Sequence, residues 1–172
     1  MKFKITLKID RKYGDLLPFN YQYEQSAVIY RILAQADTQY SSWLHENGYQ
    51  LNGSKRFKLF CYSPFIFEKV RPLPKEGCLN IMGERATWYI SFIPEKSTME
   101  FIQGIFAHQS FTIGNRKYQV AFDVVGVEAM PMPPLSEVMT FQALSPICVK
   151  LHEDNKTQYL SPDNPMFVEG VL

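Results

Sequence analysis

The order of strand-like and helix-like segments constrains the fold of this chain more than any other feature of its sequence. Residues 2–9 alternate lysine or threonine with apolar side chains, which is the two-residue period of a strand with one buried face. Similar patterns indicate a helix over residues 21–36, strands over 57–67 and 86–93, a helix over about 94–106, and a strand around 120–124. This order predicts an α+β fold, a ferredoxin-like antiparallel four-stranded sheet with helices on one face.

The segment after residue 36 carries the signals of a second, shorter helix. Asp37 restarts the helical pattern, which continues through Leu44, and Gly48 is placed to end it in a left-handed conformation. Near the other end of the chain, Asn164-Pro165 combines an N-cap residue with proline at the first helical position. A short helix is therefore predicted to begin there.

Two further strand predictions depend on turn signals. Leu79–Met82 and Ala86–Ile93 flank Gly83-Glu84, which favours a hairpin that joins the two segments. A last long strand is predicted over about residues 139–151, and a Ser-Pro pair inside it indicates a bulge or an edge position.

Composition indicates a globular domain. The chain has 172 residues and 46% hydrophobic residues, enough for one domain with a hydrophobic core. No apolar run approaches the ~18 residues of a membrane span, and the N-terminus lacks the continuous apolar core of a signal peptide. We therefore expect a cytoplasmic protein without membrane contact. The three cysteines form no C-x-x-C pair, so they predict neither a disulfide framework nor a zinc site.

The charges of the chain are unevenly distributed, although its net charge is only +1. Residues 1–75 carry 12 Lys/Arg against 6 Asp/Glu, whereas residues 76–172 carry 6 against 11. A positive first half is compatible with an RNA partner. It is also compatible with a chance imbalance on solvated faces.

Several motifs occur in the order and spacing of one known family. They are KFKITLKI, LPFNYQYEQSAVIYRIL, LHENGY, KRFKLFCYSPF, LSPICVK and YLSPDNPMF. Together they resemble the CRISPR-associated endoribonucleases of the Cas6 family, in the RAMP superfamily, over nearly all 172 residues. Members of that family have two ferredoxin-like halves, and the second half ends in a glycine-rich loop that helps to hold the RNA.

The resemblance implies a domain organisation. The nine glycines of this chain do not cluster, so the chain resembles only the first half of the family. We expect a ferredoxin-like domain over residues 1–154. Residues 155–172 are then expected to start the connection to a second ferredoxin-like domain that the chain lacks.

The resemblance also implies an activity. Enzymes of this family cut the repeats of a CRISPR precursor transcript without a metal or another cofactor. The ribose 2′-hydroxyl attacks the adjacent phosphate, which leaves a 2′,3′-cyclic phosphate and a 5′-hydroxyl. CRISPR repeat RNA is therefore the expected partner, and subunits of a CRISPR interference complex are further candidates.

His45 is the leading catalytic candidate. A histidine side chain ordinarily titrates near ~6.5 and can act as a general acid or base at neutral pH. A position near the end of the predicted helix also fits a histidine that interacts with the helix dipole, and the spacing alone favours that interpretation. The resemblance favours catalysis, because LHENGY matches the histidine segment of the family.

Tyr30 and Lys58 are the candidate partners of His45. The match of AVIYRIL implies that Tyr30 transfers a proton opposite His45, although this spacing is also typical of a half-buried core tyrosine. Lys58, at the start of KLFCYS, would stabilise charge on the phosphate in the transition state. Lys55 is an alternative because both lysines belong to one basic loop, and either could instead be an ordinary solvated charge.

Five basic side chains are candidates for contact with the RNA backbone: Lys55, Arg56, Arg31, Lys4 and Lys8. Such contacts would make binding weaken as the salt concentration rises. No cluster of His, Asp or Glu has metal-ligand spacing, so no metal site is predicted.

Three hypotheses about function stay open at this point. The first is a metal-independent endoribonuclease, with His45 and Tyr30 in acid and base roles and Lys58 on the phosphate. The second is a module that binds repeat RNA, or docks into an interference complex, without cutting, because the second half with its glycine-rich loop is absent. The third is a scaffold that recovers its missing half by forming a homodimer, in which a second copy covers an exposed sheet edge and the apolar tail.

Overall fold

The computed structural model describes residues 1–50, 56–131, 134, 136–140, 142–143, 147–153 and 156–171. The chain divides into two units, Met1–Met132 and Pro133–Leu172. The domain boundary at residue 154, with residues 155–172 as the start of an interdomain connection, stays a prediction. None of the helices in the described ranges is long and apolar enough to cross a membrane.

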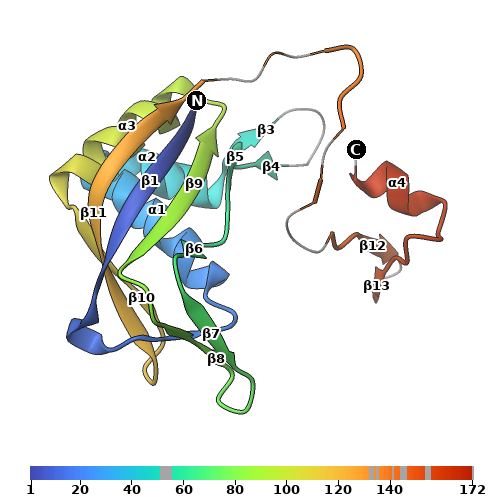
Figure 1. Ribbon diagram of the computed structural model, residues 1–172. Coiled ribbons are helices and arrows are strands. Elements are labelled where there is room, and N and C mark those ends of the chain that lie inside the picture. Colours follow the sequence, from blue (N-terminus) through green and yellow to red (C-terminus); the bar gives the residue numbers. More distant parts are fainter. Residues whose placement is uncertain are drawn as a thin grey trace. The chain divides into compact units, whose positions relative to one another are not determined.

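The first unit is built on an antiparallel sheet (Figure 1). Its central strand β1 (Lys2–Asp10) lies between β11 (Gln119–Met130) and β9 (Arg85–Phe92), and β5 (Phe60–Tyr62) pairs with the far edge of β9. If these four strands are numbered in chain order, their spatial order across the sheet is 4-1-3-2, which is the arrangement of a ferredoxin-like sheet. The predicted fold class is therefore confirmed.

Two further strands extend this sheet within the described residues. β10 (Ser110–Gly114) pairs with β11, and β6 (Ile66–Phe67) pairs with β9. β10 is not predicted from the sequence, because only one of its five side chains, Ile113, is buried and its pattern does not alternate cleanly.

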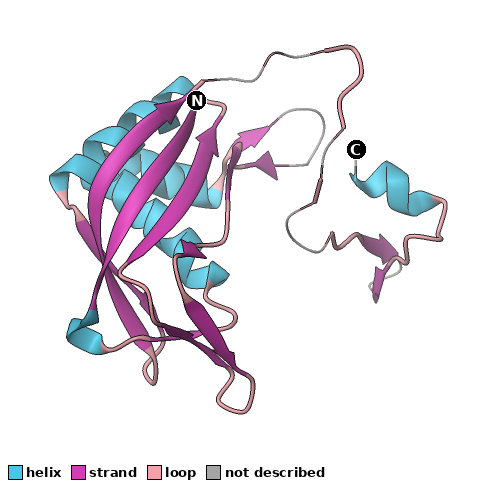
Figure 2. Cartoon of the chain, viewed as in Figure 1, coloured by secondary structure: helices cyan, strands magenta, loops and turns pink. Residues whose placement is uncertain are grey.

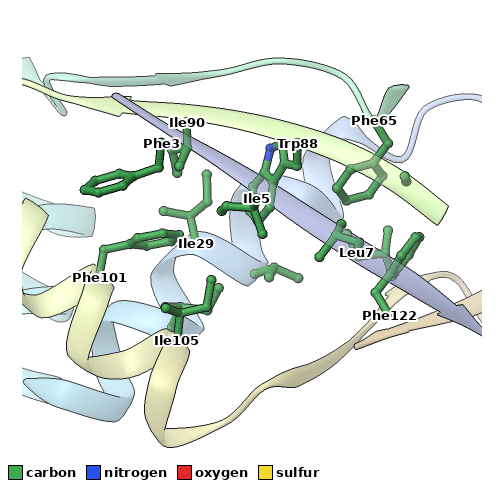
Figure 3. Close-up of a cluster of buried hydrophobic side chains, with 14 of the residues drawn as sticks. Phe3, Ile5, Leu7, Ile29, Phe65, Trp88, Ile90, Phe101, Ile105 and Phe122 are labelled. Atoms are coloured by element: carbon green, nitrogen blue, oxygen red, sulfur yellow. The ribbon is translucent and has the colours of Figure 1, made fainter. Parts of the chain in front are cut away.

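Three helices cover one face of the sheet (Figure 2). They are α1 (Gln22–Ala36), α2 (Thr38–Glu46) and α3 (Glu95–Ala107). The apolar residues of β1 point toward them, and Figure 3 shows Ile5 among Ile29 of α1, Phe101 of α3 and Trp88 of β9. The predicted buried face of β1 is thus correct, and its lysines lie on the opposite face of the sheet.

α1 and α3 pack closely against each other at Gly104. A Cβ atom added there would lie 1.8 Å from the carbonyl oxygen of Ile32 and 2.8 Å from its carbonyl carbon. These are backbone atoms, which cannot rotate away as a side chain would. Glycine at residue 104 therefore sets the distance between the two helices.

The corner between α1 and α2 forms as its sequence predicts. The backbone N–H of Asp37 donates to the carbonyl of Leu33 and ends α1. The carboxylate of Asp37 then accepts from the N–H of Tyr40 at 2.8 Å and begins α2. Gly48, with a φ of 67°, follows the last turn of α2, as expected for a left-handed cap.

The predicted hairpin around Gly83-Glu84 is wrong. β8 (Cys78–Ile81) does not pair with β9 but with β2 (Leu16–Pro18) and β7 (Val70–Leu73), in a separate three-stranded sheet. Arg11 provides a physical reason, because its guanidinium donates to the carbonyls of Ile81 and Gly83, each at 3.1 Å. These long-range bonds occupy backbone groups at the place where a hairpin turn would form.

The strand predicted over residues 57–67 is divided. The range holds the end of β4 (Arg56–Phe57), which pairs with β3 (Tyr49–Gln50), and the strands β5 and β6 of the main sheet. Leu59 has a φ of 55°, in the left-handed region, and interrupts the extended backbone between β4 and β5.

The second unit contains a hairpin and a short helix. β12 (Lys150–Glu153) pairs with β13 (Lys156–Tyr159). The long strand predicted over 139–151 is wrong for the described part of that range, where regular strand begins only at Lys150. α4 (Met166–Val171) confirms the predicted helix start, and the side chain of Asn164 accepts from the N–H of Met166 at 2.9 Å.

Candidate functional site

Tyr30 lies on α1 and is half-buried against the edge strand β5. Its ring meets Phe60 edge-on, with 5.7 Å between the ring centroids. Burial raises the pKa of the Tyr30 phenol, and electrostatic interaction with Tyr62 raises it further. The phenol is therefore protonated at neutral pH and available as a hydrogen-bond or proton donor.

His45 lies in the last turn of α2, and its imidazole is exposed. The ring centroid is 4.9 Å from that of Tyr30, and the two ring planes are nearly perpendicular at 82°. One turn earlier, the hydroxyl of Ser41 donates to the backbone carbonyl of Tyr30 at 2.8 Å. Residues four apart lie on the same face of a helix, so this bond turns the His45 face of α2 toward Tyr30.

Lys58 contacts the same end of α2. Its ammonium donates to the carbonyl of Leu44 at 2.6 Å and to the carbonyl of His45. The last carbonyls of a helix have no partner within it, and a cation there also interacts favourably with the helix dipole. Burial lowers the pKa of the Lys58 amine, and the positive charge of Arg56 lowers it further. Two of the three N–H donors of an ammonium are used by these bonds, so the third is available for another acceptor.

The turn at Gly48 brings Lys58 to the helix end. A Cβ atom at residue 48 would lie 2.7 Å from the carbonyl oxygen of Phe57 and 3.2 Å from Cδ of Lys58. The positive φ favours glycine, and the close approach to the Phe57 carbonyl leaves no room for a Cβ atom. The chain can therefore fold the segment of Phe57 and Lys58 directly against the end of α2.

These contacts bring the three predicted catalytic residues together. Tyr30 contacts the ring of His45, and Lys58 contacts its backbone. The site thus combines a phenol, an imidazole and an ammonium at the C-terminal end of one helix. Such a set can accept a proton, donate a proton and stabilise negative charge.

The other basic candidates lie in different places. Arg56 donates to the carbonyl of Glu46 at 3.3 Å and so lies at the same helix end as Lys58. Arg31 donates to the carbonyl of Thr112 on β10 at 3.3 Å. Lys4, whose ammonium lies 3.2 Å from Glu128, and Lys8 are on the sheet face that points away from the helices. Lys55 lies outside the described residues.

An aromatic row that is not among the predicted site residues adjoins the site. Phe60 stacks on Tyr62 with 6.4 Å between centroids, and the Tyr62 hydroxyl donates to the carbonyl of Gln22 at 3.1 Å. The row links Tyr30 to the start of α1. Its sequence signal, aromatic side chains at strand spacing, is more often explained by the packing of a core strand. In the part of the chain that the structure describes, no group of three His, Cys, Asp or Glu side chains could hold a metal ion.

Comparison with known proteins gives concordant results. Residues 16–123, more than half of the chain, match the family described as CRISPR-associated protein Cas6, N-terminal. A CRISPR-associated endoribonuclease Cas6 of Methanocaldococcus jannaschii is 30% identical over 172 residues, which cover 98% of this chain and 62% of that relative.

Two solved structures have the same fold. One is described as a Cas6-related gene product from Pyrococcus furiosus, with a TM-score of 0.77 and 24% identity over 99% of this chain and 65% of that chain. The other is a RAMP protein binding different RNA substrates, with a TM-score of 0.75 and 24% identity over 99% and 66%. The chain thus spans less than two thirds of the length of each of these three relatives. It belongs to the Cas6 family of CRISPR-associated proteins and corresponds to the N-terminal part of that family.

Proposed function

We propose that this chain is the catalytic N-terminal half of a metal-independent endoribonuclease that cuts CRISPR precursor RNA within its repeats. The observation that carries the proposal is the contact between Tyr30 and His45, with Lys58 on the same helix end. The name of the relative from M. jannaschii, an endoribonuclease, supports the same reaction class.

In the proposed reaction the imidazole of His45 takes the proton of a ribose 2′-hydroxyl. The 2′-oxygen attacks the adjacent phosphorus, and the bond from phosphorus to the 5′-oxygen breaks. The phenol of Tyr30 donates its proton to that leaving oxygen, and the remaining N–H of Lys58 stabilises charge on the phosphate. The products are a 2′,3′-cyclic phosphate and a 5′-hydroxyl, and return of the proton from imidazolium to phenolate restores the site.

Assignment of the acid and base follows from the environment of the two groups. Burial raises the pKa of Tyr30, so its phenol keeps its proton at neutral pH and is suited to the acid role. His45 is exposed at the surface, where a ribose could reach its ring. We therefore assign the base role to His45.

The test is cleavage of a CRISPR repeat RNA in EDTA by the wild type and by His45→Ala and Tyr30→Phe. General acid or base catalysis typically contributes about 10²–10⁴-fold, so each variant should lose activity in that range. His108→Ala, another exposed histidine at a helix end, is the matched control and should keep the wild-type rate. Equal rates for wild type and His45→Ala would rule out the catalytic assignment.

A second candidate function is binding of repeat RNA without cleavage. This function is supported by Lys58, because its ammonium donates to two backbone carbonyls and so has a structural role that does not depend on catalysis. RNA binding that weakens with salt, together with no cyclic-phosphate product, would favour this function over the first.

The predicted basic residues and the other predicted partners belong to the same proposal. We propose that Arg56, Arg31 and Lys55 meet the RNA near the cleaved linkage, and that Lys4 and Lys8 meet more distant backbone. Docking to interference complex subunits, formation of a homodimer and a cytoplasmic location are further proposals. Light scattering tests the dimer directly.

A further inference from the structure

A hollow with aromatic walls lies at the C-terminal end of α2. Its volume is about 410 Å³, and it is lined by Trp43, Asn47, Gly48, Tyr49, Gln50 and Arg56. A volume of roughly 300–1,000 Å³ is typical of sites that bind small molecules. The proposed reaction uses none of the side chains in this hollow, and only Arg56 among them is a proposed RNA contact.

The aromatic wall is exposed and held in place. Trp43 is 38% exposed, whereas the other tryptophan, Trp88, is fully buried. The indole of Trp43 stacks on Tyr40 with 5.8 Å between ring centroids and lies nearly perpendicular to the ring of Tyr49, with 5.1 Å between centroids. The hydroxyls of Tyr40 and Tyr49 are hydrogen-bonded to each other at 2.9 Å, which fixes the two rings that support the indole.

The polar groups of the hollow fit one class of ligand. Asn47 and Gln50 bring carboxamides, and Arg56 brings a guanidinium that uses one N–H on the carbonyl of Glu46. None of the described residues that line the hollow is acidic. Aromatic faces stack nucleobases, carboxamides bind base edges, and guanidinium groups bind phosphate.

We propose that this hollow binds one unpaired nucleotide of the RNA, with its base stacked on Trp43 and its phosphate on Arg56. The inference rests on the proposed function, because it takes RNA as the substrate. Trp43 lies two residues before His45 on α2, so its side chain leaves the helix on the side opposite to the imidazole, and Asn47, which follows the helix, lines the same hollow. A helix with its side chains is about 10–12 Å wide. Single-stranded RNA that crosses this helix end therefore meets both the hollow and the catalytic residues.

The two tryptophans provide a direct binding assay. Tetranucleotides with 2′-O-methyl ribose lack the attacking hydroxyl, so they report binding without cleavage. We expect them to quench the emission of Trp43 in a saturable way, and we expect Trp43→Phe to lose this signal because Trp88 is buried. Inorganic tripolyphosphate, which carries charge but no base, should not quench. Equal quenching by tripolyphosphate would overturn the base-binding inference.

Affinity provides the second measurement. Trp43→Ala removes one stacking contact. The variant should therefore bind a labelled tetranucleotide about 5- to 150-fold more weakly than the wild type does. Tyr23→Ala removes an aromatic side chain that is 82% exposed and outside the hollow, so it should bind as the wild type does. Wild-type affinity in Trp43→Ala would overturn the inference.

The two proposals fail in different ways. If the wild type does not cut repeat RNA but its Trp43 emission is quenched by the tetranucleotides, the cleavage proposal fails and the nucleotide site stands. If cleavage depends on His45 while Trp43→Ala binds tetranucleotides as the wild type does, the nucleotide site fails and the cleavage proposal stands.

Discussion

Gly104→Ala tests the helix packing that positions the candidate site. The added Cβ would lie 1.8 Å from the carbonyl oxygen of Ile32, whereas real Cβ atoms essentially never approach within 3.0 Å of a heavy atom that is distant along the chain. α1 and α3 must therefore separate locally by at least about 1 Å. Tyr30 lies two residues before Ile32 on α1, so the same displacement moves its ring relative to His45.

The size of the effect follows from two opposing contributions. Overpacking of a core costs about 1–3 kcal/mol and sometimes more, and we expect the upper end here because the clash is with backbone. Alanine gains about 1 kcal/mol over glycine within a helix. The free energy of unfolding should thus fall by about 2 kcal/mol.

The measurement is urea unfolding followed by circular dichroism, with the midpoint and slope fitted separately. Gln103→Ala, at the exposed neighbouring position of α3, is the matched control and should change stability by no more than about 0.5 kcal/mol. A Gly104→Ala protein that is as stable as the wild type would refute the close approach of α1 and α3.

Three further predictions concern charge. Lys58→Met keeps most of the aliphatic stem but removes the donor to two carbonyls. Thermal or urea unfolding should therefore show a free energy of unfolding lower by about 1–2 kcal/mol. Lys58→Arg keeps a donor and should reduce the free energy of unfolding less. Burial raises the pKa of Tyr40 above its ordinary value of 10.0. The protonated hydroxyl of Tyr40 therefore contributes fully to stability below pH 10, and this contribution is lost as the pH rises from there toward the folded-state pKa. Unfolding measured across the alkaline range should therefore show a smaller decline in Tyr40→Phe, and an unchanged decline would contradict the burial of this hydroxyl. Arg56→Gln and Lys8→Gln should each reduce the slope of log affinity for repeat RNA against log salt concentration by about 1. An unchanged slope would show that the substituted residue does not contact the RNA backbone.

Local patterns in the sequence predict much of the first unit. The alternation in β1, the cap at Asp37 and the left-handed Gly48 each follow from side chains close in sequence. The order of these elements was sufficient to predict the ferredoxin-like sheet. Each of these features is decided within a few residues of the chain.

Errors in the prediction occur where a distant contact decides. The sequence around Gly83-Glu84 is typical of a hairpin turn. Arg11, which lies 70 or more residues earlier in the sequence, instead donates to the carbonyls of Ile81 and Gly83. The break at Leu59 has no glycine to indicate it. Local periodicity contains no information about either feature.

The candidate site was predictable only in part. The resemblance identified Tyr30, His45 and Lys58, and the structure places them together. The carbonyl partners of Lys58 could not be predicted, because backbone groups at a helix end leave no mark in the side-chain sequence. The hollow beside Trp43 was missed for a related reason, since it forms only when β3 and β4 fold against α2.

The way in which Lys58 is held has an electrostatic consequence. A carboxylate would fix an ammonium equally well, but it would also cancel a full unit of charge. Carbonyl groups at a helix terminus carry only about half an elementary charge in total, so a lysine anchored by them keeps a net attraction for anions. The last turn of α2 thus holds a cation in a defined position while leaving much of its field directed at whatever negative group approaches.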